Sequence, residues 1–114
     1  MSDCLFCRLV AGELPAQKVH EDAYTLAFRD LHPQAPTHLL VIPKRHIGGF
    51  AELTAADGPL LGHLAAAANT AAQEAGLAEG GYRVVCNQGR DAGQTVPHLH
   101  WHVLGGRPLA WPPG

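Results

Sequence analysis

Three histidines recur at every second position near the end of the chain, in the segment His98-Leu99-His100-Trp101-His102-Val103. Successive side chains of a β-strand point to opposite faces, so a strand here would place the three imidazoles on one face, about 7 Å apart. The apolar residues between them would then face the core. Two kinds of chemistry suit such a row. The imidazoles can converge on a metal ion, or one can act as a nucleophile while its neighbours organise protons and phosphate oxygens.

The polar loop before this segment favours chemistry at phosphorus. In residues 88–95, Gly93 and Thr95 can offer backbone N–H groups and a hydroxyl, and Asn87 can add an amide donor. A phosphate needs such hydrogen-bond donors, whereas a zinc ion cannot use them. A neutral imidazole attacks phosphorus without help from a strong base, and a covalent intermediate divides one difficult displacement into two easier ones. Because the sequence has no carboxylate cluster that would hold magnesium, we expect this chemistry to need no cofactor.

Cys4 and Cys7 form a second group that could do chemistry. Their spacing does not indicate a haem site, since Arg8 rather than histidine follows, and no strand precedes them as in thioredoxin-like motifs. Together with His46 and His98 they could form a Cys₂His₂ zinc site. The alternative is a pair of buried thiols. If His98 binds zinc, it is not available to the reaction.

The pattern of apolar and polar residues predicts the elements that position these groups. We expect a short helix over residues 4–10, ended by Gly12, and one long helix from Thr54 to Gly76, with Thr54 and Asp57 resembling a capping box. Five strands are expected over residues 18–21, 24–30, 38–42, 82–87 and 98–104, the third of them buried on both faces. Because strands and helices do not alternate strictly, the pattern predicts an α+β fold with a five-stranded antiparallel sheet, one long helix and one short helix.

The composition limits the class of protein. With 114 residues, of which 46% are apolar and 16% charged, we expect one folded domain over residues 1–114. The net charge of −2 argues against nucleic-acid binding, which requires a basic surface. The start of the chain has no signal-peptide pattern, and no segment has the length of a membrane span. Three cysteines without a secretory signal indicate a reducing compartment. We therefore expect a cytoplasmic protein that binds neither nucleic acid nor membrane.

The histidine segment resembles the signature of the histidine triad (HIT) superfamily, His-φ-His-φ-His-φ-φ with φ apolar, at every position from 98 to 104. Other segments resemble the Hint branch of that superfamily, so the resemblance extends over essentially the whole chain. They are Leu5-Phe6, Gly12-Glu13-Leu14-Pro15, Phe28-Arg29-Asp30, Pro33-Gln34-Ala35-Pro36-Thr37-His38, Val41-Ile42-Pro43-Lys44, Gly93-Gln94-Thr95-Val96, Gly105-Gly106-Arg107 and the Trp-Pro-Pro-Gly ending. The resemblance implies a HIT-like fold.

The resemblance also implies roles for three histidines. His100 matches the nucleophile that attacks the α-phosphorus and forms a nucleotidyl-histidine. His102 matches the partner that contacts phosphate and handles protonation of the leaving group. His38 resembles a buried histidine that supports the tautomer of the nucleophile.

Binding residues follow by matching position. Asn87, Gly93 and Thr95 match phosphate-contacting positions, and Asp30 matches the acid that holds the ribose hydroxyls. The resemblance implies a two-fold dimer, and Trp111 would reach toward the partner's site. The apolar slot for a purine base is implied at Leu5, Phe6, Leu9, Phe28 and Leu31.

Several bacterial proteins that this chain resembles hold zinc on two cysteines and two histidines. The matching residues are Cys4, Cys7, His46 and His98. Relatives without these cysteines fold anyway. We therefore expect a zinc ion that is structural and takes no part in the reaction.

Taken together, the sequence predicts a hydrolase that cleaves the P–N bond of purine nucleoside phosphoramidates, with aminoacyl-adenylates as a related substrate class. Three alternatives stay open. The first is a dinucleoside polyphosphate hydrolase or nucleotidyl transferase of a sister branch. The second is a metal-dependent hydrolase that uses the histidine triplet as ligands. The third is a nucleotide-binding module without enzymatic activity.

Overall fold

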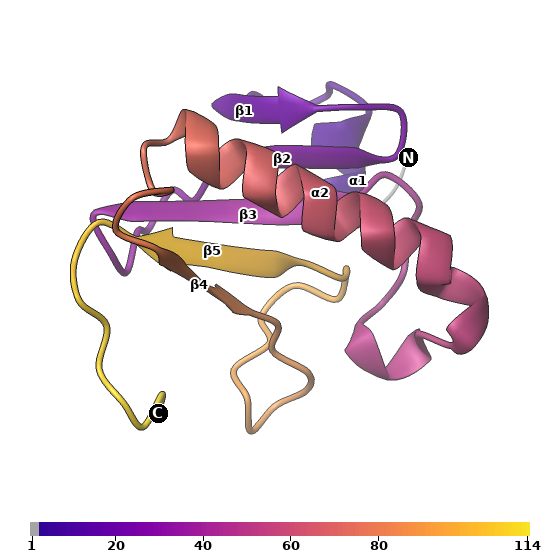
Figure 1. The fold of residues 1–114 in the computed structure, drawn as a ribbon. Helices are drawn as coiled ribbons and strands as arrows, with labels where there is room; N and C mark the ends of the chain where they lie inside the picture. Colours follow the sequence, from indigo (N-terminus) through magenta and orange to yellow (C-terminus); the bar gives the residue numbers. More distant parts are fainter. Residues whose placement is uncertain (1–2) are drawn as a thin grey trace.

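Figure 1 shows the computed structural model of the chain, which describes residues 3–114. Five antiparallel strands form one sheet in the order β1-β2-β3-β5-β4. The strands are β1 (Lys18–Glu21), β2 (Thr25–Arg29), β3 (Thr37–Pro43), β4 (Tyr82–Val85) and β5 (Trp101–Gly105). The α-helices are α1 (Leu5–Val10) and α2 (Gly58–Glu74), with 3-10 turns η1 (Phe50–Glu52) and η2 (Ala55–Asp57) between β3 and α2. The predicted α+β fold, with its long and short helix, is confirmed.

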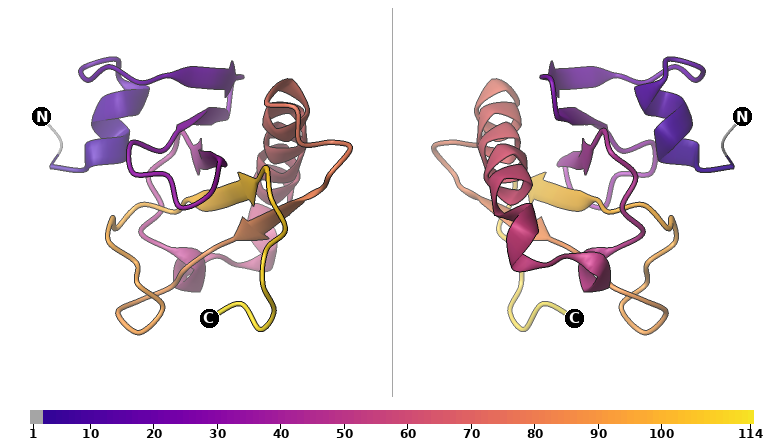
Figure 2. Two further views of the ribbon diagram at one scale, coloured as in Figure 1. Left: turned by 90° about the vertical axis from the view of Figure 1, so that its left-hand side faces the viewer. Right: turned by 90° about the vertical axis from the view of Figure 1, so that its right-hand side faces the viewer.

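The central strand β3 is buried on both faces, as its continuous apolar sequence predicts. Leu39 and Val41 pack on the side of α2, whereas Leu40 and Ile42 pack on the opposite side with Phe6 of α1. Figure 2 shows the two helices on opposite sides of the sheet. The sheet therefore separates two apolar clusters.

On the α2 side, every buried member of the cluster is aliphatic. The helix contributes Leu64, Ala67, Ala68, Ala71 and Ala72. Alanine has the highest helix propensity, and its small side chain lets the helix lie close to the sheet. Within residues 3–114, no helix combines the length and the hydropathy that a bilayer span requires.

The prediction that the long helix begins at Thr54 is wrong by about one turn. Thr54 caps η2, and its own N–H donates to the carboxylate of Asp57 over 2.9 Å, which is the predicted capping box. The first turn tightens to 3-10 geometry, and α2 begins at Gly58 with Pro59 in its first turn, where the missing N–H of proline costs no hydrogen bond. Gly76, with φ of 82°, follows the end of the helix.

The strand predicted over residues 98–104 is wrong at its start, because β5 begins at Trp101. The N–H of Leu99 donates to the carbonyl of Ile47 over 2.6 Å, so the backbone there bonds to a loop instead of a neighbouring strand. β4 also ends earlier than expected, at Val85. Two of the three histidines therefore lie on an irregular approach to the strand.

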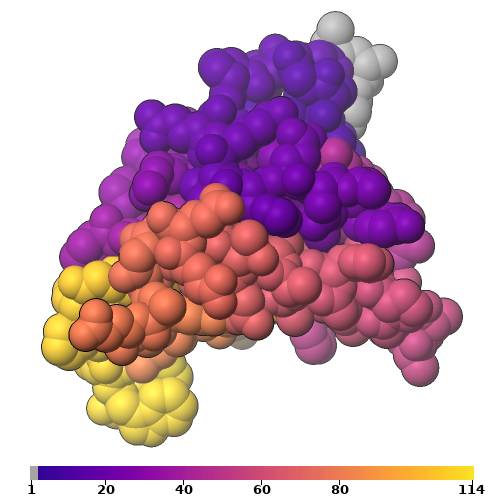
Figure 3. All heavy atoms as spheres, turned by 45° about the horizontal axis from the view of Figure 1, so that its top comes forward, coloured from indigo at the N-terminus to yellow at the C-terminus, as the bar shows by residue number. Residues whose placement is uncertain are grey.

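The C-terminal tail runs beside β4. Arg83 donates to the carbonyl of Ala110 over 3.0 Å, and its guanidinium lies 5.8 Å from the ring centroid of Trp111. Figure 3 shows the tail, in yellow, projecting from the body of the molecule. Trp111 is 80% exposed, so the tail buries little of this side chain.

Candidate functional site

A pocket of about 470 Å³ opens beside the histidines, on the α1 side of the sheet. Its apolar wall comes from α1, β2 and the residues that follow β2. The predicted site residues that line it are Leu5, Phe6, Leu9, Phe28, Asp30, Leu31, Thr95, His100 and His102. The structure thus brings the predicted apolar slot and two of the predicted catalytic histidines into one cavity.

His100 is buried, and its Nδ1 lies 2.7 Å from the main-chain carbonyl of His98. A carbonyl oxygen only accepts hydrogen bonds, so Nδ1 carries a proton. In the neutral ring, Nε2 then keeps its lone pair. The Phe6 ring packs against this imidazole nearly at right angles, with centroids 5.2 Å apart, and restricts its orientation. His100 therefore presents the tautomer that a nucleophile at Nε2 requires.

His38 lies outside the pocket lining and pairs with His102. The backbone N–H of Gln34 donates to Nδ1 of His38 over 3.0 Å, so the proton of the neutral His38 ring is on Nε2. That Nε2 lies 2.8 Å from Nδ1 of His102 and 3.5 Å from the carboxylate of Asp30. His102 accepts at Nδ1, and its neutral ring therefore carries an N–H at Nε2.

This pairing corrects one role that the resemblance implied. We expected His38 to support the tautomer of His100, but the carbonyl of His98 sets that tautomer, and His38 bonds to His102. The reason is the register of the sheet. His38 of β3 is opposite Leu104 of β5, two residues beyond His102, so the two histidines are diagonal neighbours on one face.

The three histidines of the triplet do not converge on one point. His98 joins Cys4, Cys7 and His46, whereas His102 joins His38 and Asp30 with ligand atoms within 4.8 Å of one another. A metal in the second group would need a lone pair on Nε2 of His38, which carries the proton as long as Nδ1 accepts from the backbone. We interpret this group as a hydrogen-bonded relay, and the geometry gives no support to a hydrolase that uses the triplet as metal ligands.

Burial keeps the paired rings uncharged. Burial first, and then the proximity of His100 and His38, lowers the pKa of His102 to about 4, although Asp30 opposes the shift. Burial also lowers the pKa of His38 against the opposing effect of Asp30. Both rings are thus neutral at neutral pH, which maintains the order of donors and acceptors described above.

The polar loop reaches the pocket only at its end. Thr95 lines the pocket, whereas Asn87 and Gly93, which we expected to contact phosphate, do not. Gln94 explains this course. Its side-chain oxygen accepts from the N–H of Gly89 over 2.9 Å, and its amide nitrogen donates to the carbonyls of Val96 and Gly48, which ties the loop to itself and to the segment after β3. Trp111 also lies outside the lining, beside β4.

Several lining residues were not predicted from the sequence. Residues 14–17 connect α1 to β1, and a loop has no periodicity that shows which side chains face a cavity. The sequence pattern could have predicted Leu40, because this residue is two positions from His38 on a strand and therefore shares its face. The unpredicted residues are Leu14, Pro15, Ala16, Gln17, Arg29, His32, Leu40 and Val96.

Cys4, Cys7, His46 and His98 form what we call the Cys–His cluster, with ligand atoms within 4.8 Å of one another. Nδ1 of His98 lies 3.3 Å from Sγ of Cys4, 3.6 Å from Sγ of Cys7 and 3.2 Å from Nδ1 of His46. Tetrahedral zinc, with bonds of about 2.0–2.3 Å, separates its ligand atoms by about 3.3–3.8 Å. The residues predicted to hold zinc therefore fit that ion.

The tautomer of His98 supports the same interpretation. Its Nε2 lies 2.9 Å from the carbonyl of Pro43 and carries the proton, so Nδ1 faces the cysteines with a lone pair. A carbonyl that orients a histidine in this way is the usual second partner of a metal ligand. Burial lowers the pKa of His98, against the effect of the Pro43 carbonyl, and favours the neutral ring that a metal requires.

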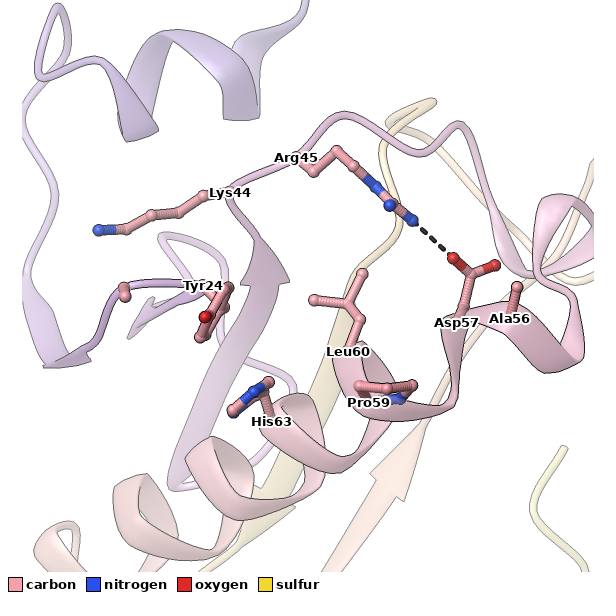
Figure 4. A pocket seen from close by; sticks show the side chains of 9 residues that line it. Tyr24, Lys44, Arg45, Ala56, Asp57, Pro59, Leu60 and His63 are labelled. Carbon is pink, nitrogen blue, oxygen red and sulfur yellow. Dashed lines mark hydrogen bonds and ion pairs between the residues drawn. The ribbon is translucent and has the colours of Figure 1, made fainter.

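A second cavity, of about 490 Å³, lies beside the start of α2, and Figure 4 shows the residues that line it. Tyr24 and His63 stack there with ring centroids 4.3 Å apart. Lys44 and Arg45 are the cations of this cavity, and each pairs with a carboxylate: Lys44 with Glu21 at 2.9 Å and Arg45 with Asp57 at 2.6 Å. Its charged groups are thus satisfied within the chain.

Comparison with known proteins identifies the family of this chain. The family model of the HIT domain matches residues 11–109. An uncharacterized HIT-like protein of Synechococcus elongatus is 54% identical over 112 residues, which cover 98% of this chain and 97% of that protein. The crystal structure of a HIT family hydrolase from Legionella pneumophila is similar with a TM-score of 0.95 and 51% identity, over 98% of this chain and 100% of that one. A histidine triad nucleotide-binding protein from Candida albicans has a TM-score of 0.82 and 31% identity, over 96% and 83% of the two chains. The chain therefore belongs to the HIT domain family.

Proposed function

We propose that this protein is a hydrolase that cleaves the P–N bond of purine nucleoside phosphoramidates through a nucleotide attached covalently to His100. One observation carries the proposal: His100 has a lone pair at Nε2, whereas His102 has an N–H at Nε2. Their ring centroids are 5.1 Å apart. A nucleophile beside a hydrogen-bond donor is what displacement at phosphorus requires. Relatives named as a hydrolase and as a nucleotide-binding protein support the same class of reaction.

In the first step, the lone pair of His100 Nε2 attacks the α-phosphorus and the P–N bond breaks. The nitrogen departs with the electron pair of that bond and takes up one proton from solvent. The N–H of His102 donates to the reacting group and stabilises the charge that develops there. His38 is a positioning residue, because it holds His102 in the tautomer that can donate.

In the second step, water attacks phosphorus and the P–Nε2 bond breaks. The lone pair returns to His100, the nucleoside monophosphate leaves, and water releases the proton that the first step consumed. The phosphorus–imidazole bond is labile, so this step needs no further nucleophile.

The pocket supplies separate places for the parts of a purine mononucleotide. The apolar wall of Leu5, Phe6 and Phe28 suits a base, and Asp30 can accept from ribose hydroxyls. Thr95 lies in the same lining as the histidines and can donate to a phosphate oxygen.

The decisive experiment replaces the nucleophile. We expect His100→Ala to lower kcat for adenosine 5′-phosphoramidate by at least about 10³-fold and to leave the affinity for AMP nearly unchanged, as measured by calorimetry. His63→Ala is the matched control, because His63 lies in the other cavity. A His100→Ala protein that keeps most of its turnover contradicts the proposal, as does a trapped nucleotidyl adduct on any other side chain.

The choice of substrate distinguishes the alternatives. Rates for adenosine phosphoramidate and for a diadenosine polyphosphate should be measured on the same preparation, and we expect the first to be clearly higher. A preference for the polyphosphate would indicate the sister branch. Binding of AMP without turnover of either compound would indicate a nucleotide-binding module.

We also propose that the Cys–His cluster holds one structural zinc ion. The support is the fit of its ligand distances and the tautomer of His98. Zinc would hold α1 against the segments that carry His46 and His98, and we give it no part in the reaction. Elemental analysis of the purified protein tests the stoichiometry.

Finally, we propose that two copies associate through β4. Among residues 3–114, this strand is at the edge of the sheet and pairs only with β5. Its Val84 is 45% exposed. An unpaired edge with an exposed apolar side chain is suited to pairing with a second copy. Light scattering that gives the mass of a single chain would contradict the dimer.

A further inference from the structure

The Cys–His cluster and the reaction site share one residue, His98, which serves them through different atoms. Its ring nitrogen Nδ1 belongs to the cluster, where it lies 3.3 Å from Sγ of Cys4. Its Nε2–H donates to the carbonyl of Pro43 over 2.9 Å. Its main-chain carbonyl accepts from Nδ1 of His100 over 2.7 Å. A displacement of the His98 ring therefore moves the group that sets the tautomer of His100.

Loop hydrogen bonds and the burial of the Leu99 side chain hold the backbone around His98, instead of a strand ladder. Residues 98–100 precede β5 and lie outside the ladder that pairs β5 with β3. The N–H of Leu99 donates to the carbonyl of Ile47, the residue after His46. That bond joins the two segments that carry the histidine ligands. The position of the His98 carbonyl thus depends on the cluster and on the burial of Leu99, and strand pairing does not fix it.

α1 connects the cluster to the pocket a second time. Cys4 caps this helix and Cys7 lies in its first turn, whereas Phe6 and two leucines of α1 line the pocket. The Phe6 ring stands nearly perpendicular to the rings of both His98 and His100, with centroid distances of 5.8 and 5.2 Å. A helix of six residues is far too short to be stable alone in water. Its position depends on side-chain packing and on the cluster.

We propose that the Cys–His cluster, when it holds a metal ion, positions the reaction site: it fixes α1 and the His98 carbonyl, and so sets the orientation of His100 and the shape of the purine slot. The inference rests on the proposed function for its effect on turnover. Its effects on AMP affinity and on the tautomer of His100 do not depend on which phosphoramidate is hydrolysed. The sheet and α2 stay folded without the metal, because their core lies on the other face.

The test compares Cys7→Ser with Cys86→Ser, each with the wild-type protein. Cys86 is the matched control, because it packs at the margin of the α2 cluster and is not a member of the Cys–His cluster. On all three proteins we would measure zinc content, far-UV circular dichroism, AMP affinity, nitrogen-15 spectra of the histidine rings, KM and kcat. For Cys7→Ser we expect loss of zinc, retained secondary structure, AMP binding weaker by about tenfold and kcat lower by about 10–100-fold, the usual range when support for a site is removed. We also expect its His100 to show a mixture of tautomers, and Cys86→Ser to match the wild type.

Two further proteins complete the experiment. Cys7→His restores a ligand that zinc accepts, and we expect zinc content, AMP affinity and a single His100 tautomer to return together. If Cys7→Ser does not fold, wild-type protein treated with a chelator gives the same comparison.

A zinc-free chain with wild-type AMP affinity, kcat and His100 tautomer overturns the inference. Unfolding of the chelated wild-type protein also overturns it, because the cluster would then serve the fold as a whole. Failure of the proposed function is distinguishable: the zinc-loaded wild type would hydrolyse no phosphoramidate, while AMP affinity and the His100 tautomer would still respond to the cluster.

Discussion

The two sides of the sheet bury different kinds of side chain. On the α2 side the buried cluster is entirely aliphatic, whereas the α1 side buries His38, His98 and His100 next to its apolar residues. A buried imidazole is costly unless its nitrogens have partners. Each of these rings has at least one: the N–H of Gln34 for His38, the Pro43 carbonyl for His98, and the His98 carbonyl for His100. The buried cluster of the first side is purely apolar, whereas the second side combines apolar burial with polar burial that fixes tautomers.

The two cavities show the same contrast. In the cavity beside α2, cations and carboxylates neutralise one another, and the rings of Tyr24 and His63 stack on each other. In the cavity beside α1, the relay through His38 ends at His102 Nε2, and His100 Nε2 keeps its lone pair. Size does not distinguish the two, since they measure about 490 and 470 Å³. The difference is whether polar atoms are left to act on a ligand.

The largest effect expected from the contrast is on turnover. We expect His102→Ala to lower kcat by about 10²–10³-fold, the range for loss of one oriented hydrogen-bond donor, because the N–H at Nε2 disappears. The melting temperature should change little, since His102 is half-buried at the pocket. His63→Ala, in the other cavity, should keep wild-type kinetics. Steady-state kinetics and thermal denaturation of both variants measure these effects. A large loss of stability with normal kcat in His102→Ala would contradict the assignment of catalysis to the α1 side.

On the α2 side we expect the opposite result, a loss of stability without a loss of kcat. Leu64 is fully buried there, so Leu64→Ala should lower the free energy of unfolding by about 3 kcal/mol through lost burial and a new cavity. The folded fraction should keep wild-type kcat. Leu61→Ala, on the half-buried margin of the same cluster, should cost clearly less. Denaturant titration measures both. An equal loss in the two variants would contradict the assignment of the core to this face.

How far these features follow from the sequence also depends on the side of the sheet. Helical spacing of leucine and alanine predicts α2, and the apolar run of residues 38–42 predicts β3, because each pattern is imposed by one continuous burial surface. The members of the Cys–His cluster and of the apolar pocket wall are likewise predicted, from residue types and from resemblance. The pairing of His38 with His102 is not, because it depends on the register between two strands that are distant in the chain. The course of the loop around Gln94 depends on side-chain hydrogen bonds that leave no periodic signal.

The neutral relay predicts a pH dependence of stability. The pKa of His102 falls from 6.5 to about 4 on folding, mainly through burial. Below about pH 6.5, this ring takes up a proton in the unfolded chain, whereas the folded chain resists protonation until about pH 4. The contribution of His102 to stability is therefore complete above about pH 6.5 and is lost as the pH falls through 4. For a half-buried ring we expect about 2 kcal/mol, after allowance for solvent screening. Denaturant titrations between pH 7 and 4 should show a smaller loss for His102→Asn than for wild type, and an unchanged loss for His63→Asn.

The smallest effect is expected from the tail, which belongs to neither face. Its hydrogen bond from Arg83 and the contact of that guanidinium with Trp111 are both at the surface, where such contacts contribute about 1 kcal/mol or less. A chain that ends at Leu109 should therefore unfold within a few degrees of the full chain. If two copies pair through β4 and Trp111 reaches the partner's pocket, the same truncation changes the ratio of kcat/KM between two phosphoramidates with different amines. An unchanged ratio would leave the tail without a role in specificity. A collapse in stability would mean that it belongs to the α2-side core, which its exposure argues against.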